Sequence, residues 1–313
     1  IATSNCYEKT TPSNSRAIII AGGGNPKDPL QDAINANANL AYKTLRQRGI
    51  IADNIRYFNA VAQDADGDTV IDTYSDAPTK ALVQDSIENI NSWGGSTVDA
   101  SNPVVVYLID HGGTDIFYLN KPANDYAEVL KADEINTWLN TLQSATGARL
   151  TFVYDACSSG SFVDNLQQSS ITDYDRINLF SSGGDQSAFF GGKGQLSFSQ
   201  FFWSNTAVGM DVRTAFRSGE VAIRAATQNG DKTYQDAVLD DNGDGSNSFA
   251  DGLLARDTFL GNIDDSNLHP IVNGSQGSQT VDLNQGSSLD LYAEVDLAND
   301  LIERVWAIVI PPD

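Results

Sequence analysis

The sequence predicts an α/β protein of three layers, in which helices cover both faces of a mostly parallel sheet. Short apolar and β-branched runs of strand length recur along the chain. Amphipathic segments with helical spacing separate these runs, which is typical of strands joined by crossover helices. The runs show little alternation with polar residues, as expected for strands that are buried on both faces of a sheet.

The first strands and the first helix are predicted from the residues at their ends as well as from their apolar residues. Residues 16–21 form the first predicted strand, and three glycines follow it. Asp28 then supplies an acidic cap and Pro29 a first-turn proline for a helix that Gly49 ends. The next strand is predicted at residues 54–60, before an acidic loop that contains Asp64, Asp66 and Asp68.

The rest of the alternating pattern runs to about residue 227. Its predicted elements are a helix at 79–93, a strand at 103–110, a hairpin strand at 116–119, a helix at 132–142, strands at 150–154 and 176–182, and two helical patterns within 197–227 broken near Gly219. After residue 265 the composition shifts toward Gly, Ser, Asn and Gln. Apolar and polar residues alternate at 289–295, and residues 304–310 form a β-run, so a small C-terminal β appendage is predicted.

Composition and charge restrict the class of partner. The chain has 313 residues, 41% hydrophobic, with 19 basic and 41 acidic side chains and a net charge of -22. So acidic a protein is not expected to bind nucleic acid or an anionic membrane. No apolar run approaches the roughly 20 residues of a membrane-spanning helix. The acidic surface and the start at Ile1 without methionine lead us to expect a mature secreted or cell-surface protein.

The candidate catalytic residues lie at the ends of two predicted strands. The apolar run that ends at Tyr154 leads to Cys157, after which a helix is expected to start at Ser161, and the run that ends at Asp110 leads to His111. Because ligands of parallel sheets bind at the carboxyl ends of the strands, we expect the thiol and the imidazole at one edge. Either residue alone is usually a packing residue, but the matched pair, each followed by glycine, favours a nucleophile and its base. Strand alternation points Asp110 away from His111, which favours a structural role for that carboxylate.

A hydrophobic strand before His-Gly and another before Asp-Ala-Cys-Ser-Ser-Gly resembles the caspase-like clan of cysteine peptidases, most closely its legumain-type family in bacterial form. The resemblance covers roughly residues 16–227. It implies a caspase-like fold and hydrolysis of peptide bonds in a protein or peptide substrate. It also implies that Cys157 is the nucleophile, that His111 is its partner, and that the backbone N–H groups of Gly112 and Cys157 bind the oxyanion.

Asp155 lies two residues before Cys157 and therefore faces the same side of the strand. In members of the clan that cut after Arg or Lys, an acid at this place lines the specificity pocket. Legumains, which cut after Asn, carry a glutamate there and an Arg-His pair after the first strand, and this chain lacks the pair at residues 24–28. A pocket carboxylate prefers a cation, so we predict cleavage after Arg or Lys. Three residues at and after the end of the next strand are predicted to form another pocket wall: Ser181, Ser182 and Asp185.

A second motif predicts a structural calcium site, and no organic cofactor is predicted. Residues 240–251 fit an EF-hand loop at positions one, three, five and six, with aspartate at position twelve. The expected ligands are Asp240, Asn242, Asp244, Ser246 and Asp251. The loop of Asp64, Asp66 and Asp68 fits less well, because glycine stands at its fourth position, and a solvated acidic turn is an equal alternative there.

The sequence thus predicts a short N-terminal arm at 1–15, a caspase-like peptidase domain at 16–265 and the β appendage at 266–313. The favoured function is a cysteine endopeptidase that uses Cys157 and His111. The alternatives are a legumain-type asparaginyl endopeptidase or transpeptidase on the same site, and a non-catalytic binding module on a caspase-like scaffold.

Overall fold

The computed structural model describes residues 14–24, 28–75, 78–95, 97–120, 128–168, 175–228, 234–261, 271–275 and 293–296. The chain divides into two compact units, one of Tyr7–Ile263 and one that combines Ile1–Cys6 with Asp264–Asp313. In the second unit, β11 (Ile271–Ser275) pairs antiparallel with β12 (Ala293–Asp296). Most of the predicted arm and the β-run at 304–310 lie outside the described residues.

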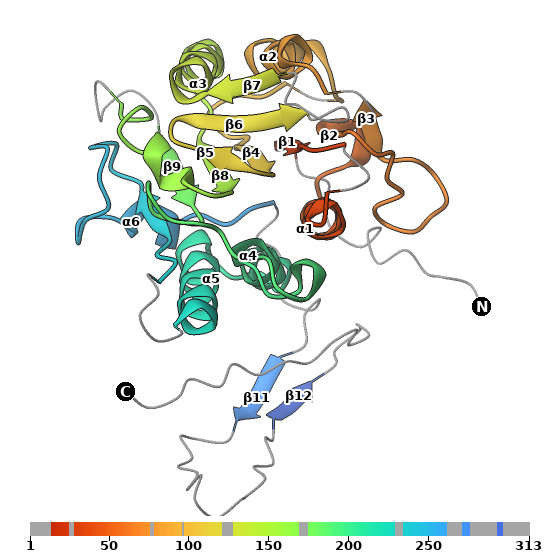
Figure 1. Ribbon diagram of the computed structural model, residues 1–313. Coiled ribbons are helices and arrows are strands. Elements are labelled where there is room, and N and C mark those ends of the chain that lie inside the picture. The colour runs from red at the N-terminus through yellow and green to blue at the C-terminus, as the bar shows by residue number, and fades with distance from the viewer. Residues whose placement is uncertain are drawn as a thin grey trace, which may run out of the picture. The chain divides into compact units, whose positions relative to one another are not determined.

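The larger unit is built on a seven-stranded sheet in the order β10-β9-β8-β4-β1-β2-β3 (Figure 1). Its strands are β1 (Arg16–Ala21), β2 (Ile55–Asn59), β3 (Thr73–Ser75), β4 (Val104–Ile109), β8 (Leu150–Asp155), β9 (Arg176–Phe180) and β10 (Val238–Asp240). Neighbouring strands are parallel except at one edge, where β10 runs antiparallel to β9. The predicted mostly parallel sheet is therefore confirmed.

Helices cover both faces of this sheet, so the predicted three layers are confirmed as well (Figure 1). The helices are α1 (Gln31–Gln47), α2 (Lys80–Glu88), α3 (Ala132–Thr146), α4 (Phe198–Ala207), α5 (Val212–Thr227) and the short α6 (Leu253–Arg256). Single 3-10 turns are η2 (Ala52–Asn54), η3 (Ile90–Ser92), η4 (Ser159–Phe162) and η5 (Gly192–Gly194). Helices α1, α4 and α5 pack on one face, and α2 and α3 pack on the other.

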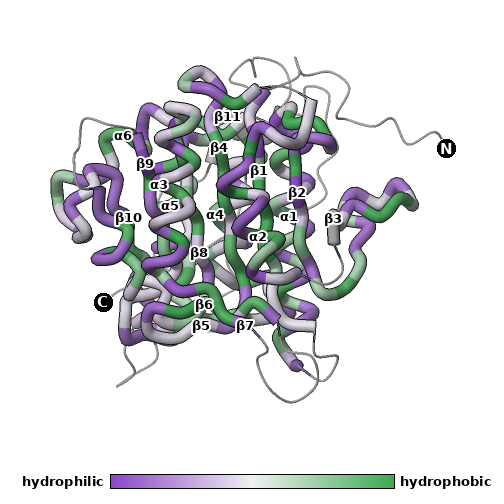
Figure 2. The backbone as a smooth tube through the Cα atoms, turned by 90° about the horizontal axis from the view of Figure 1, so that it is seen from above, coloured by the Kyte–Doolittle hydropathy of each residue, from purple (hydrophilic) through white to green (hydrophobic). Residues whose placement is uncertain are grey.

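The central strands are buried on both sides because their side chains alternate between two apolar cores. In β4, Val105 and Tyr107 join the core under α1 and α4, whereas Val106 and Leu108 join the core under α2 and α3. Seen from above, the hydrophobic stretches of the chain gather along β1, β4 and β8 (Figure 2). No helix in the described part of the chain is both long and apolar enough to cross a bilayer.

A small antiparallel sheet stands beside the carboxyl end of β4. It consists of β5 (Gly112–Gly113), β6 (Ile116–Asn120) and β7 (Glu128–Lys131). The predicted hairpin strand after His111 is therefore confirmed as β6, while β7 adds a third strand that the sequence did not predict. This sheet begins at Gly112, so it fixes the backbone that follows His111.

Two local predictions were wrong. The break near Gly219 does not exist, because Gly219 lies inside α5 and the real break is between α4 and α5. A Cβ on Gly219 would lie 2.7 Å from the ring of Phe198, so this glycine allows close packing of the two helices. The chain after Cys157 also forms only the 3-10 turn η4, not an α-helix that starts at Ser161.

Candidate active site

The two predicted strand ends are neighbours in the sheet. Strand β4 pairs directly with β8 in parallel, with Leu108 opposite Tyr154 and Ile109 opposite Asp155. His111 and Cys157 each follow two residues after these last paired positions. The topology therefore brings the imidazole and the thiol to one edge of the sheet, at adjacent strands.

Gly112 packs against the loop that carries Cys157. A Cβ at Gly112 would clash with the carbonyl oxygen of Cys157, and it would lie 2.5 Å from the hydroxyl of Tyr154 and 2.9 Å from Cβ of Ala156. The His-Gly segment and the Cys157 loop are thus in contact through their backbones. Only glycine allows this approach, which explains the residue type after the histidine.

Cys157 is a free thiol and is partly exposed to solvent. The backbone N–H of Ala188 points at its sulfur across 3.4 Å. A donor in this position stabilises the negative charge of a thiolate. Ser158, the next residue, has φ 56°, a left-handed conformation that non-glycine residues adopt infrequently. This turn carries the chain away from the sulfur directly after the cysteine.

Ser181 and Ser182 are both fully buried and bind the backbone of the Cys157 loop. The Ser181 hydroxyl oxygen accepts the N–H of Ala156 at 3.2 Å. The Ser182 hydroxyl donates to the Ala156 carbonyl at 2.9 Å, and the Ser159 N–H donates to the Ser182 hydroxyl oxygen at 3.3 Å. The structure therefore gives these hydroxyls, predicted as part of a pocket wall, contacts that hold the loop in place.

Asp185, the third residue of that predicted wall, lies exposed on the following loop. The same loop touches the Cys157 segment through its backbone, because the N–H of Ser158 donates to the carbonyl of Gln186 at 2.7 Å. Gln186 is in turn anchored by Asp236, whose carboxylate accepts from its side-chain amide at 3.0 Å. These hydrogen bonds anchor the loop of residues 181–190, which borders the thiol of Cys157.

The partner of His111 was missed in the sequence. Nε2 of His111 lies 3.0 Å from Oδ2 of Asp28. The imidazole is 29% exposed, whereas the Asp28 side chain is only 5% exposed. The sequence predicts Asp28 as a helix cap, and Oδ1 of Asp28 does accept the N–H of Leu30 at 2.9 Å. The same carboxylate therefore caps the helix and contacts the distant His111. Asp110 lies against Gly22, where an added Cβ would clash with its carboxylate.

Asp155 is fully buried on the face of the sheet that α4 covers. Its Oδ2 accepts the backbone N–H of Ser199 at 3.1 Å and the Ser199 hydroxyl at 2.6 Å. Its Oδ1 is buried without a hydrogen-bond partner among the described residues. Burial raises the pKa of the Asp155 carboxyl above its usual value, because the charged form is poorly solvated there, although Ser199 and the nearby Ser181 hydroxyl oppose the shift.

The predicted calcium loop has the turn geometry that its spacing implies. Oδ1 of Asp240 accepts the N–H of Gly243 at 2.8 Å, and Oδ2 accepts the N–H of Gly245 at 3.2 Å. Burial, with the nearby charges of Asp251 and Asp244, raises the pKa of Asp240 to about 6. Arg176 interacts electrostatically with this carboxylate, and the loop offers oxygen donors of the kind that calcium prefers.

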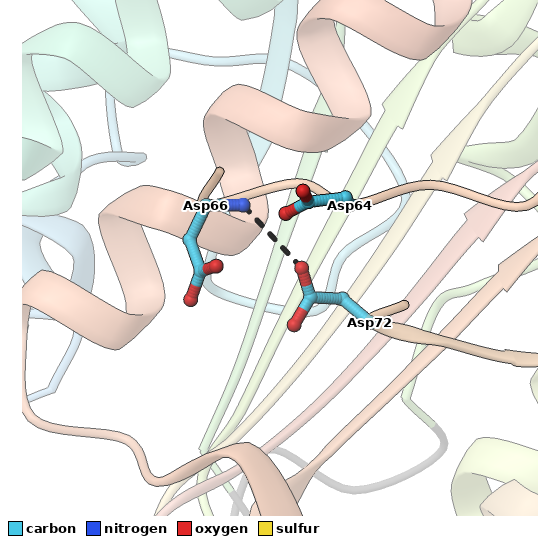
Figure 3. Close-up of side chains that lie close together, drawn as sticks. All are labelled: Asp64, Asp66 and Asp72. Carbon is cyan, nitrogen blue, oxygen red and sulfur yellow. Dashed lines mark hydrogen bonds between the residues drawn. The ribbon is translucent and has the colours of Figure 1, made fainter. Parts of the chain in front are cut away.

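A second group of acidic side chains, outside the predicted calcium loop, has oxygen atoms close enough together to hold a metal ion. Among the described residues, one set of three acidic side chains has carboxylate oxygens within 4.8 Å of one another, namely Asp64, Asp66 and Asp72 (Figure 3). Oδ2 of Asp72 accepts the N–H of Asp66 at 3.3 Å. Asp68, the third acid of the predicted turn, instead accepts the N–H of Val70 at 2.8 Å. This group belongs to an exposed loop and is separate from the strand ends that carry Cys157 and His111.

The chain is similar to one protein family over part of its length and to solved structures. The family model of Peptidase C13 matches residues 91–174. A crystal structure of caspase-1 from Spodoptera frugiperda matches with 12% identity, covering 75% of this chain and 89% of that chain, at a TM-score of 0.49. No curated protein sequence matches.

The matched segment begins before β4 and ends after η4, so it contains His111, Gly112, Asp155 and Cys157. Over this segment the chain is similar to the Peptidase C13 family.

Proposed function

We propose that this protein is an endopeptidase in which the Cys157 thiolate attacks the peptide carbonyl and His111 handles the proton. The observation that carries the proposal is the backbone contact of Gly112 with the Cys157 loop, because it holds the two strand ends together. The thiol proton passes to the imidazole, which then protonates the leaving amine. Water next attacks the acyl-enzyme, with the imidazole as its base, and releases the acid and the free thiol.

The backbone N–H groups of Gly112 and Cys157 are our candidates for the oxyanion donors. Both belong to the two segments that meet at the sheet edge, and the absence of a side chain at Gly112 leaves its backbone accessible at close range. Ser181 and Ser182 would then serve catalysis indirectly. They keep the Cys157 loop in one conformation, so that the donor at Cys157 stays fixed.

For specificity we propose cleavage after Arg or Lys, with Asp155 as the recognising acid. The spacing of two residues between Asp155 and Cys157 leads us to expect both on one side of the chain, and Oδ1 of Asp155 is buried without a hydrogen-bond partner among the described residues. A cationic side chain of the substrate would supply the counter-charge that the buried carboxylate lacks.

A preference for Asn is the second candidate. Ser199 already holds Oδ2 of Asp155 with two hydrogen bonds, so the carboxylate presents one remaining acceptor, Oδ1. The side-chain amide of asparagine can donate to a single acceptor without bringing a charge into the site. Hydrolysis and transpeptidation on the same acyl-enzyme differ only in whether water or an amine accepts the acyl group.

We also propose a structural calcium ion in the loop at residues 240–251. Support comes from the alternating oxygen donors of that loop and from the buried carboxylate of Asp240. The ion would balance the charge of Asp240, Asp244 and Asp251 in the folded state, and it would take no part in the chemistry at Cys157.

The function is tested by turnover of a peptide library in which the residue before the scissile bond is varied. Wild type, Cys157→Ala and His111→Ala are compared after circular dichroism has shown that all three are folded. We expect cleavage by wild type alone, with Arg and Lys preferred. Cleavage by folded Cys157→Ala would contradict the mechanism, and a tenfold advantage of Asn peptides would replace the proposed specificity with the second candidate.

A further inference from the structure

The loop of residues 181–190, which borders the thiol of Cys157, is anchored at both ends by one buried side chain from a distant segment. Gln235 lies just before β10 and is 2% exposed. Its Nε2 donates to the carbonyl oxygen of Ser181 at 2.7 Å, and its Oε1 accepts the N–H of Phe189 at 2.8 Å. These two partners lie 54 and 46 residues away in sequence, so tertiary structure alone brings them to Gln235.

Between the two anchors, the loop contacts the sulfur of Cys157 through its backbone. The N–H of Ala188 donates to this sulfur at 3.4 Å. Phe189 follows Ala188 directly, so only the two soft backbone dihedrals of Ala188 separate the peptide unit that faces the sulfur from the unit that Gln235 holds. The anchor at Phe189 therefore restricts where the N–H of Ala188 can point.

The carboxamide of Gln235 suits both anchors at once. It offers an N–H donor to the carbonyl of Ser181 and a carbonyl acceptor to the N–H of Phe189. The backbone of Gln235 is held as well, since its N–H donates to Oγ1 of Thr227, the last residue of α5, at 3.0 Å. Because the side chain is buried, replacing it with an apolar one leaves two backbone groups of the loop without their partner.

We propose that Gln235 is a positioning residue of the active site, which keeps the N–H of Ala188 on the sulfur of Cys157 and thereby stabilises the thiolate that attacks the substrate. This inference rests on the proposed role of Cys157 as the nucleophile. When the thiol proton passes to His111, the sulfur becomes an anion, and the hydrogen bond from Ala188 becomes charge-assisted and stronger. The proton of Ala188 stays on its nitrogen throughout, so the contact favours the thiolate over the thiol and transfers nothing itself.

Two substitutions at Gln235 test this role, in a Cys6→Ser background that leaves Cys157 as the one thiol of the chain. Gln235→Met keeps the length of the side chain but removes its donor and its acceptor. Gln235→Asn keeps both groups but is one methylene shorter, so it cannot span the two ends of the loop, and it serves where Gln235→Met does not fold. Gln228→Met is the matched control, because Gln228 is exposed just after α5.

The first measurement is the rate at which iodoacetamide alkylates Cys157 at about pH 6 and at about pH 10, on either side of the usual range of a thiol. Since the thiolate is the reactive form, the ratio of the two rates reports the fraction of thiolate, whereas access to the sulfur affects both rates alike. We expect this ratio to fall about three- to tenfold in both Gln235 variants, as for the loss of one hydrogen bond to a charged atom. Gln228→Met should give the wild-type ratio.

The second measurement needs no change at Gln235. At about pH 9, where a cysteine is largely thiolate, the amide proton of Ala188 should resonate downfield of its position in Cys157→Ala, because it is donated to a charged sulfur. An Ala188 amide proton at the same position in the two proteins overturns the proposal, since no hydrogen bond to the sulfur would then exist for Gln235 to hold.

The alkylation rates decide the role of Gln235 itself. An unchanged ratio in folded Gln235→Met or Gln235→Asn overturns the proposal. An equal fall of the rate at both pH values also overturns it, because the side chain would then govern access to the sulfur and not its charge. Failure of the proposed function is separate, because it shows as peptide cleavage that survives in folded Cys157→Ala or His111→Ala.

Discussion

Gly112 lies so close to the carbonyl oxygen of Cys157 that no larger residue fits at its position. This contact joins the segment after β4 to the loop after β8, and thereby sets the relative position of the imidazole and the thiol. It is a backbone relationship, so it depends on the register of two neighbouring strands more than on any side chain.

Gly112→Ala should therefore abolish most activity. The added methyl group meets the Cys157 carbonyl, the hydroxyl of Tyr154 and Cβ of Ala156, so the two segments must move apart. A displacement of about 1 Å at a reactive centre can cost roughly 100-fold in rate, and we expect kcat/KM to fall by at least that factor. Gly113→Ala is the control, because its Cβ would meet only side-chain atoms, the nearest being Cγ1 of Ile116 at 3.3 Å. Equal activity of the two variants would contradict the account.

Ser182→Ala should lower both stability and activity. The variant loses the hydroxyl that donates to the Ala156 carbonyl and accepts from Ser159, and it leaves those backbone groups buried without that partner. Such a loss costs about 1–3 kcal/mol in the free energy of unfolding, measurable by urea denaturation. Ser187→Ala, at an exposed position of the neighbouring loop, should change stability by less than about 0.5 kcal/mol. A Ser182→Ala protein with wild-type stability and turnover would show that the hydroxyl does not hold the loop.

Asp155→Asn should change both specificity and the pH dependence of stability. With the carboxylate gone, the preference for Arg and Lys peptides should fall by about tenfold or more, while Cys157 still reacts with a small alkylating agent. Since burial raises the pKa of Asp155, the folded state binds this proton more tightly than the unfolded state. Its contribution to stability is therefore present below about pH 4 and is lost as pH rises through the folded pKa.

The stability of wild type relative to Asp155→Asn should accordingly decrease as pH rises, which urea denaturation at a series of pH values measures. An equal slope in the two proteins would show that Asp155 does not titrate as its burial implies. A retained preference for Arg and Lys in the variant would remove Asp155 from the specificity pocket.

Calcium should raise the melting temperature of wild type, because a ligand that binds only the folded state stabilises it by RT ln(1 + [L]/Kd). Asp244→Ala should remove this shift, whereas Asp66→Ala, in the separate group of Asp64, Asp66 and Asp72, should retain it. Loss of the shift in Asp66→Ala alone would move the calcium site to that group. Identical melting with calcium and with chelator would leave neither loop as a calcium site.

The sheet and its active edge could be predicted because they depend on strong local signals. Buried parallel strands are continuous apolar runs, and glycines after His111 and Cys157 mark the ends of two of them. The adjacency of β4 and β8 could not be read from these runs, since strand order depends on how the helices pack across the sheet. The edge strands β3 and β10, each of three residues, are too short to give a pattern.

The side-chain contacts of the site were less accessible to sequence reasoning. Asp28 has the pattern of a helix cap, and that local role conceals its contact with a histidine 83 positions away. The hydroxyls of Ser181 and Ser182 could have faced a pocket or a backbone, and only the packing of the Cys157 loop decides between the two. Gly219 was misinterpreted for a related reason, because a glycine that admits a neighbouring ring resembles one that ends a helix.

The central claim is that Cys157 forms the covalent bond with the substrate. The most direct test treats the protein with a peptidyl electrophile that carries Arg at the position of attack, and locates the adduct by mass spectrometry. The chain has two cysteines, Cys6 and Cys157, so the unmodified one serves as an internal control. We predict one adduct per chain, on Cys157, with complete loss of peptide cleavage and no adduct after His111→Ala under the same conditions. Loss of cleavage with the adduct on Cys6, or full cleavage by a chain modified at Cys157, would contradict the account.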